Sequence, residues 1–343
     1  MAAKPRIILG LMTFGPDANT GARLTDINDL KTALDVFEKR GYKELDTARG
    51  YCNGQQEAFT RAAGYEARGL AIGTKVYPMP PGTHRPDVLT QQFETSLREL
   101  GTDCIDIAYL HAPDRSVPFV DTLAAMDALH KAGKFKRLGL SNYTAYEVAE
   151  IALTCAARGW VRPSIYQAVY NVLQRGIEGE LLAACRRYGL EVVVYSPTVA
   201  GLLAGAVRDA GAVPADGRFS DKFFGGMMRH TYFRDSTFAA VAAVRAAADA
   251  HGISAIEAGL RWLAHHSQLD FARRDGIVVG VSSLKHLDDN LAFLLDRGPL
   301  PEDLVKALDK AWLIAKPETP AYWHFDLKYG YDTEEVLFGK GAK

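Results

Sequence analysis

The segment Leu45-Asp46-Thr47-Ala48-Arg49-Gly50-Tyr51 is a short apolar run that ends in a carboxylate and continues into a loop of small and polar residues. This pattern is typical of a β-strand whose carboxyl end opens into a functional loop. Similar apolar runs, each followed by a segment with helical periodicity, recur along the chain. The expected strands are residues 6–10, 44–47, 70–76, 105–111, 137–142, 164–170, 191–197 and 277–282, and the expected helices are residues 26–40, 55–68, 87–100, 120–132, 143–158, 178–188, 254–265 and 283–296.

Strict alternation of strands and helices predicts a parallel sheet with crossover helices. Eight such units in 343 residues predict an α/β fold closed into a (β/α)8 TIM barrel, with functional residues at the carboxyl ends of the strands. A doubly wound sheet would require a G-x-G-x-x-G motif directly after the first strand. The sequence there, Leu9-Gly10-Leu11-Met12-Thr13-Phe14-Gly15, lacks that spacing. We therefore expect one barrel domain over residues 1–343.

Two segments depart from the regular alternation. A long segment rich in glycine and aromatic residues, about residues 201–236, separates the seventh strand from an Ala-rich helix expected at residues 238–250. Long loops in compact domains are commonly functional, so we expect this one to be a lid. A carboxyl-terminal extension, about residues 300–343, begins with a helix expected at residues 301–315 and continues as an aromatic tail. We expect this extension to pack over the barrel mouth.

Composition and charge exclude several classes of function. The chain is 48% hydrophobic and 24% charged, with 40 basic and 41 acidic residues, so no basic excess indicates a nucleic acid or an anionic membrane as partner. Its four cysteines, Cys52, Cys104, Cys155 and Cys185, are scattered without metal-ligand spacing. The apolar runs are too short to predict a leader segment or a membrane span, so we expect a cytoplasmic protein with free thiols and no metal site.

Ionisable residues stand at the ends of three consecutive expected strands. Asp46 ends the second, Lys75 lies at the end of the third, His111 ends the fourth, and Tyr51 follows in the loop after Asp46. Each has an ordinary explanation taken alone: an aspartate can cap a turn, a lysine can reach out of a barrel, and a histidine can bind a loop. One such group on each of three neighbouring strands favours a common site.

The chemistry of these four residues fits proton transfer. A free phenol has a pKa of about 10, and a nearby ammonium lowers it by stabilising the phenolate. A buried ammonium in turn needs a carboxylate partner. We predict that Tyr51 is the proton donor, that Lys75 and Asp46 tune it, and that a neutral His111 binds the substrate oxygen. A metal-dependent barrel hydrolase or isomerase is disfavoured, because it would need several more histidines and carboxylates at the strand ends.

The motifs Leu45-Asp46-Thr47-Ala48-Arg49-Gly50-Tyr51, Gly73-Thr74-Lys75, Leu110-His111-Ala112-Pro113-Asp114 and Gly139-Leu140-Ser141-Asn142 occur in this order over nearly the whole chain. In these motifs the chain resembles the aldo-keto reductases, and most closely the aflatoxin-aldehyde and succinic-semialdehyde reductase branch. The resemblance implies NADPH-dependent reduction of a small-molecule aldehyde or ketone, with Tyr51 as general acid, and a homodimer. The alternative is a cofactor-binding regulatory subunit on the same scaffold with little turnover.

The resemblance also implies a set of cofactor-binding residues. Ser141, Asn142 and Gln167 would hold the nicotinamide carboxamide, and Tyr195 would stack on the ring. The other implied positions before the eighth strand are Met12, Thr13, Asp46, Ser196, Pro197, Gly201, Leu203 and Gly205; those in and after that strand are Gly280, Ser282, Ser283, Lys285, His286, Asp289 and Asn290. A Ser-Ser helix start offers N–H groups and hydroxyls to an anion. Gly280 and His286 depart from other branches, and Lys285 is expected to compensate at the 2′-phosphate.

The substrate pocket is expected to differ from that of the branch. Its members carry a lid segment of the form Tyr-Arg-x-Arg-Tyr-Trp and end close to Tyr-Phe-Arg, whereas this chain has Met228-Arg229-His230-Thr231-Tyr232-Phe233 and Tyr322-Trp323-His324. One lid arginine and the terminal arginine are therefore missing. We predict a bulkier or less acidic substrate, such as an aromatic or polycyclic aldehyde or ketone, contacted by Tyr51, His111, Phe224, Arg229, Tyr232 and Trp323. Equally, the aromatic residues could pack the lid onto the barrel.

Overall fold

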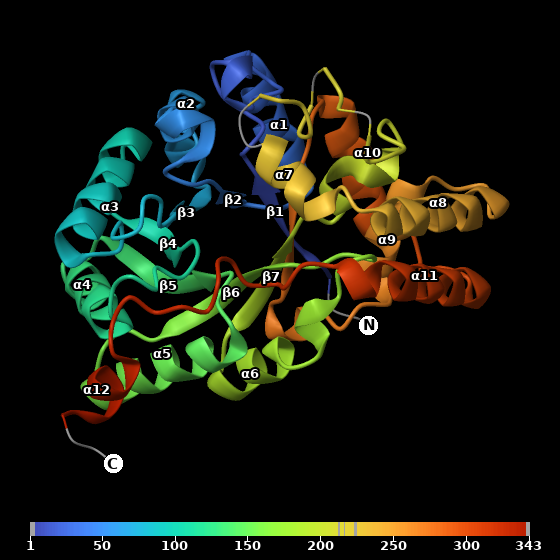
Figure 1. Cartoon of the computed structure of the whole chain (residues 1–343). Helices are drawn as coiled ribbons and strands as arrows, with labels where there is room; N and C mark the ends of the chain where they lie inside the picture. Colours follow the sequence, from blue (N-terminus) through green and yellow to red (C-terminus); the bar gives the residue numbers. More distant parts are fainter. Residues whose placement is uncertain (1–3, 212, 216, 223–224, 341–343) are drawn as a thin grey trace.

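A computed structural model describes residues 4–211, 213–215, 217–222 and 225–340. Within these residues, eight parallel strands pair in chain order, and β8 pairs with β1 to close a barrel (Figure 1). This confirms the predicted (β/α)8 fold, with each strand boundary within two residues of its expected position. The strands are β1 (Arg6–Gly10), β2 (Glu44–Asp46), β3 (Ala71–Val76), β4 (Ile105–Leu110), β5 (Phe135–Ser141), β6 (Pro163–Val169), β7 (Glu191–Tyr195) and β8 (Gly276–Gly280).

Helices surround the barrel and begin and end at residues that stabilise helix termini. Thr144 and Glu147 form a capping box at the start of α5, and Ser283 caps α10. Gly101 ends α3 with a left-handed backbone, φ 75°. The helices are α1 (Ile27–Lys39), α2 (Gln56–Ala62), α3 (Pro86–Leu100), α4 (Phe119–Lys131), α5 (Ala145–Arg158), α6 (Leu181–Tyr188), α7 (Gly225–Tyr232), α8 (Asp235–Ala250), α9 (Ala255–His265), α10 (Leu284–Leu295), α11 (Glu302–Ala315) and α12 (Thr333–Phe338).

The barrel interior is filled by side chains, and two glycines make room for the largest of them. Tyr109 is 2% exposed, and a Cβ atom on Gly139 would lie 2.2 Å from its ring, while one on Gly73 would lie 3.3 Å from it. At the amino ends of the strands, Arg6 donates to Glu44 at 2.8 Å and to Glu191 at 2.7 Å. Ion pairs thus connect strands at this end of the barrel. The candidate site residues lie at the opposite end.

Some helix predictions were wrong. The helix expected at residues 55–68 ends at Ala62, because Gly64 adopts a φ of 78°, and a 3₁₀ turn follows. The helix expected from residue 178 starts at Leu181, since Gly176–Glu178 form a 3₁₀ turn. The lid, expected as a loop, contains α7, and the tail contains α12. Tyr232 at the end of α7 interacts with Ser196 and Gln174, which lie far away in the chain.

The tail crosses the rim of the barrel before it runs down the outside. It leaves α11, which packs against α8 (Figure 1), and the backbone N–H of His324 donates to the Asn142 carbonyl at 3.0 Å. Further on, the Tyr329 ring lies 6.0 Å from that of Phe119 in α4. The extension therefore covers part of the barrel mouth, as predicted. Across the described ranges, no helix has the length and apolar character needed to cross a membrane.

Candidate active site

Asp46 and Lys75 form a buried ion pair at the carboxyl ends of β2 and β3. The Lys75 side chain is fully buried, and its ammonium donates to Asp46 Oδ2 at 2.6 Å and to the Thr47 carbonyl at 2.6 Å. Burial acts to lower the pKa of Lys75, but Asp46 and Tyr51 outweigh it, so the pKa is raised above its ordinary value. Lys75 therefore remains positively charged inside the barrel.

Tyr51 lies beside this cation on the tight turn Tyr51–Gly54. The turn depends on left-handed backbone at Cys52 and Asn53, with φ of 49° and 53°. The ammonium of Lys75 lies 5.2 Å from the centroid of the Tyr51 ring. Burial raises the pKa of Tyr51, and Lys75 lowers it only in part, so the pKa is raised overall. Lys75 thus lowers the pKa of Tyr51, which is the predicted direction, but by less than burial raises it. The phenol is therefore protonated at neutral pH.

His111 directly follows β4 and faces Tyr51. Its ring centroid lies 6.1 Å from that of Tyr51 in an edge arrangement, and its backbone N–H donates to the Val76 carbonyl at 3.0 Å. Burial lowers the pKa of His111 well below its ordinary value, and the charge of Lys75 lowers it further. The imidazole is therefore neutral, and its Nδ1 is buried without a hydrogen-bond partner among the described residues.

The structure thus brings together the four residues that the sequence predicted for proton transfer. Tyr51 carries a protonated phenol, Lys75 a fixed positive charge beside it, and His111 a neutral ring that can form hydrogen bonds. Such a set can protonate a carbonyl oxygen that gains negative charge. In the part of the chain that the structure describes, no group of three or more His, Cys, Asp and Glu side chains could hold a metal ion.

Polar side chains at the ends of β5, β6 and β7 adjoin this set. Gln167 Nε2 donates to Asp46 Oδ1 at 2.8 Å, and the Tyr195 hydroxyl donates to Asn142 Oδ1 at 2.8 Å. Asn142 has a φ of 62°, which asparagine tolerates better than most residues, and its Nδ2 donates to Ser141 Oγ at 3.0 Å. These predicted cofactor residues form two hydrogen-bonded groups: Gln167 binds the ion pair through Asp46, and Tyr195 is linked through Asn142 to Ser141.

The predicted residues after β7 lie in a strained turn. Ser196 has a φ of 57°, and its carbonyl accepts a hydrogen bond from Asn171 Nδ2 at 3.1 Å. Pro197 follows, and the 3₁₀ segment Val199–Ala204 contains Gly201 and Leu203 and ends at Gly205. Gly201 and Gly205 have φ of 95° and 74°, which favour glycine. The chain therefore turns sharply at this rim.

The predicted residues around the start of α10 form a polar surface. Ser283 Oγ accepts from the His286 backbone N–H at 3.2 Å, and the Ser282 hydroxyl lies 3.1 Å from His286 Nδ1. Lys285 donates to Asp289 at 2.5 Å. Asn290 is buried behind them, while a Cβ atom on Gly280 would meet open space. This region offers hydroxyls, a helix start and a cation.

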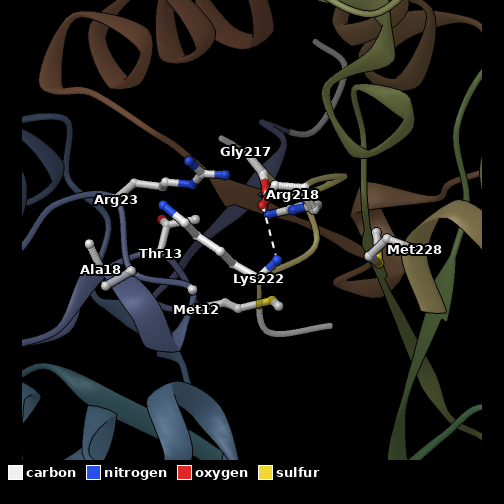
Figure 2. A pocket seen from close by; sticks show the side chains of 11 residues that line it. Met12, Thr13, Ala18, Arg23, Gly217, Arg218, Lys222 and Met228 are labelled. Atoms are coloured by element: carbon white, nitrogen blue, oxygen red, sulfur yellow. Dashed lines mark hydrogen bonds between the residues drawn. The ribbon is translucent and has the colours of Figure 1, made fainter. Parts of the chain in front are cut away.

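A pocket between the loop after β1 and the lid carries three cations (Figure 2). Arg23 from the loop and Arg218 and Lys222 from the lid line it, beside the predicted cofactor residues Met12 and Thr13. Three cationic side chains around one pocket suit a ligand with several negative charges. These three residues were not predicted from the sequence, because nothing local indicates that residue 218 faces residue 23.

The Aldo/keto reductase family model matches residues 6–313. The chain belongs to the aldo/keto reductase family. It is 38% identical over 330 residues to aflatoxin B1 aldehyde reductase member 2 of Rattus norvegicus, covering 93% of this chain and 88% of that protein. It is also 38% identical to aldo-keto reductase family 7 member A3 of Homo sapiens, covering 94% of this chain and 98% of that protein.

A solved structure has the same fold. It is the crystal structure of an aldo/keto reductase from Klebsiella pneumoniae in complex with NADP and acetate. The two structures have a TM-score of 0.65 and 25% sequence identity, and the match covers 94% of this chain and 95% of the Klebsiella pneumoniae chain. The agreement of family, relatives and fold makes this chain an oxidoreductase of the aldo/keto reductase family.

The lid of this aldo/keto reductase contains three of the six predicted substrate residues, Phe224, Arg229 and Tyr232. Tyr232 is buried, and its ring lies 6.1 Å from that of Phe219. Burial raises its pKa, and hydrogen bonding to Ser196 opposes this. The Arg229 guanidinium donates to the Phe219 carbonyl at 2.5 Å and to Asp221 at 2.6 Å, so it holds the lid together. Phe224 lies outside the described residues.

The tail places an unpredicted histidine at the site. Trp323 packs perpendicular to Tyr322, with ring centroids 5.0 Å apart. The next residue, His324, lies with its Nδ1 3.2 Å from the hydroxyl of Tyr77, and the Tyr77 ring is 5.2 Å from that of His111. The position of Tyr77 just after β3 could have suggested a rim residue. The sequence predicted that the tail would lie over the barrel mouth, but not that His324 would be the residue that meets Tyr77.

Proposed function

We propose that this aldo/keto reductase reduces an aldehyde or ketone to the alcohol with NADPH, and that Tyr51 donates the proton. The observation that carries this proposal is the charged Lys75, fully buried against Asp46 and beside the Tyr51 ring. A permanent cation at this place stabilises the phenolate that remains after proton transfer.

The residues around the ion pair fit NADPH. The amide and hydroxyl groups of Ser141, Asn142 and Gln167 suit the nicotinamide carboxamide, and Tyr195 adjoins them. The pocket with Arg23 and its neighbouring cations, together with the polar surface at the start of α10, suits the phosphates. NADP bound to the Klebsiella pneumoniae relative supports the same cofactor. When bound, NADPH supplies the hydride that reduces the carbonyl carbon.

Protein groups handle the proton at the carbonyl oxygen. His111, held neutral by burial, donates a hydrogen bond to that oxygen and orients it. As the oxygen gains negative charge, the Tyr51 O–H bond breaks and its proton forms the alcohol O–H. The resulting phenolate is stabilised by Lys75 until solvent returns a proton. Asp46 keeps Lys75 charged and takes no proton itself.

We further propose a bulky or weakly acidic carbonyl substrate, with Tyr232 and Trp323 among its contacts. Arg229, the cation that this chain retains in its lid, donates its hydrogen bonds within the lid, which supports a substrate without a carboxylate. The regulatory alternative is not favoured, since the relatives described above are named as reductases.

Oxidation of NADPH in the presence of aldehydes tests the proposal. Purified protein should oxidise NADPH with 4-nitrobenzaldehyde faster than with succinic semialdehyde, and faster with NADPH than with NADH. Protein without aldehyde is the control. A clear preference for NADH would contradict the cofactor assignment, and a preference for succinic semialdehyde would contradict the proposed substrate class. The absence of oxidation above the control would contradict the proposed function.

A further inference from the structure

Tyr51 is the member of the candidate active site that no strand positions. Asp46 ends β2, Lys75 lies in β3 and His111 directly follows β4, so pairing of the strands fixes their places. Tyr51 instead lies in the 3₁₀ turn Tyr51–Gly54, which follows β2 after a short loop. A shift of about 1 Å at a reacting group can reduce turnover about 100-fold. The place of Tyr51 beside Lys75 therefore depends on contacts outside the β-ladder.

Arg49, in the loop before Tyr51, connects this turn to the barrel. Its backbone N–H donates to the Lys75 carbonyl at 2.9 Å. Its guanidinium donates to the carbonyl of Gly54, at the end of the turn, and to the carboxylate of Glu57 in α2. A Cβ atom on Gly54 would lie 2.7 Å from Arg49 Nη2. The glycine thus leaves the space that the guanidinium needs to reach the turn.

Glu57 completes the connection by binding β3. Its side chain is fully buried, and that of its partner Arg49 is 14% exposed. Glu57 Oε1 accepts a hydrogen bond from the hydroxyl of Thr74 at 2.6 Å, and Thr74 directly precedes Lys75 in β3. Burial raises the pKa of Glu57, and the charge of Arg49 opposes this rise. The buried pair therefore joins the turn that carries Tyr51 to the strand that carries Lys75.

The geometry that this pair imposes explains its burial better than stability does. A buried ion pair can often be replaced by apolar side chains without loss of stability, because removing two charges from water is costly. The charges that most affect the pKa of Tyr51 are Lys75 and Asp46. The pair Arg49–Glu57 thus acts on the phenol through the position of the turn.

We infer that Arg49 and Glu57 are positioning residues for carbonyl reduction, which hold the Tyr51 phenol beside Lys75 by joining its turn to β3. The inference rests on the proposed function, in which Tyr51 donates the proton, and adds the groups that place this donor. Neither residue is assigned a contact with the substrate or with NADPH.

Arg49→Met tests the inference, because methionine cannot make the hydrogen bonds to Gly54 and Glu57. With 4-nitrobenzaldehyde, kcat should fall by about 10–100-fold, while the KM for the aldehyde and the Kd for NADPH stay within about twofold of the wild-type values. Arg49→Lys keeps the charge and can make one of the two side-chain contacts, so it should recover part of kcat. If thermal melting shows that Arg49→Met does not fold, the combination of Arg49→Met with Glu57→Gln replaces it, since no buried charge then lacks a partner.

A double-mutant cycle with Tyr51→Phe separates positioning from a general loss of structure. If Arg49 acts by placing the Tyr51 hydroxyl, Arg49→Met should change the residual turnover of Tyr51→Phe by less than about twofold. A loss of folded protein would instead lower turnover by the same factor in both backgrounds. Single-turnover reactions with protein in excess over NADPH measure the low rates of Tyr51→Phe.

Arg261→Met is the matched control. The Arg261 side chain is also 14% exposed, pairs with Glu257 at 2.9 Å and donates to the Gly298 carbonyl at 2.9 Å. These contacts join α9 to the loop after α10 and do not involve the candidate site. This variant should keep kcat within about twofold of the wild-type value.

Two results would overturn the inference while leaving the proposed function intact. One is a folded Arg49→Met protein with wild-type kcat. The other is a loss from Arg49→Met that is equally large in the wild-type and Tyr51→Phe backgrounds. The absence of NADPH oxidation by the wild-type protein, or retained turnover in Tyr51→Phe, would instead overturn the proposed function and the inference together.

Discussion

The rim of the barrel and its roof differ in what fixes their side chains. At the rim, Asp46, Lys75 and His111 come from neighbouring strands and are positioned by the β-ladder. In the roof, formed by the lid at residues 201–236 and the strap at residues 322–330, positions depend on pairs distant in sequence, such as Arg115 with His324. The difference teaches that strand pairing positions the rim residues, whereas contacts between distant segments position those of the roof.

The largest effect is expected at the rim, from Lys75→Met. The substitution removes the charge that stabilises the Tyr51 phenolate, and it leaves Asp46 buried without a cation. Turnover should fall by about 10²–10⁴-fold, and the free energy of unfolding by about 3–5 kcal/mol. Steady-state kinetics and urea unfolding measure the two effects.

Lys131→Met is the matched control for this prediction. Lys131 also pairs with an aspartate at 2.6 Å, Asp127, but its side chain is 65% exposed. An exposed pair contributes about 0–1 kcal/mol, so this variant should be nearly as stable and as active as the wild type. Equal losses in the two variants would contradict the role given to the buried pair.

A smaller effect is expected in the roof, from Arg218→Ala. Loss of one charged hydrogen-bonding partner should weaken NADPH binding by about 10–100-fold, measured by quenching of protein fluorescence. Arg229→Ala is the comparison, because Arg229 binds within the lid and should change NADPH affinity much less. If the two variants lost the same affinity, the cationic pocket would not be the phosphate site.

The smallest effect is expected from pH. His84 is 1% exposed, its Nε2 lies 3.1 Å from the Val76 carbonyl, and burial lowers its pKa to about 4. Since this pKa lies below the unfolded value of about 6.5, its stabilising contribution is complete above pH 6.5 and is lost as pH falls toward 4. At pH 5 the loss should be about 2 kcal/mol.

Urea unfolding at pH 7.5 and pH 5 measures this loss. His84→Gln, which cannot take up the proton, should lose less stability between these two values than the wild type. The prediction fails if the wild type and the variant show the same change, since the proton would then bind elsewhere.

The rim and the roof also differ in how much of their structure the sequence could predict. Alternation of strands and helices sufficed for the barrel, and the strand ends sufficed to bring Asp46, Lys75 and His111 together. The net effect on the Tyr51 pKa was not predictable, because burial depends on the whole fold. Arg218 and His324 were missed for a related reason: each reaches the site through contacts with segments far away in the chain.

The most direct measurement of the central claim is turnover and NADPH binding by Tyr51→Phe. The substitution removes one hydroxyl and keeps the ring beside Lys75. Because the proton donor is lost while the groups assigned to the cofactor remain, NADPH should bind with nearly wild-type affinity and aldehyde reduction should fall by about 10²–10⁴-fold. Retained turnover in a folded, NADPH-binding Tyr51→Phe protein would contradict the account.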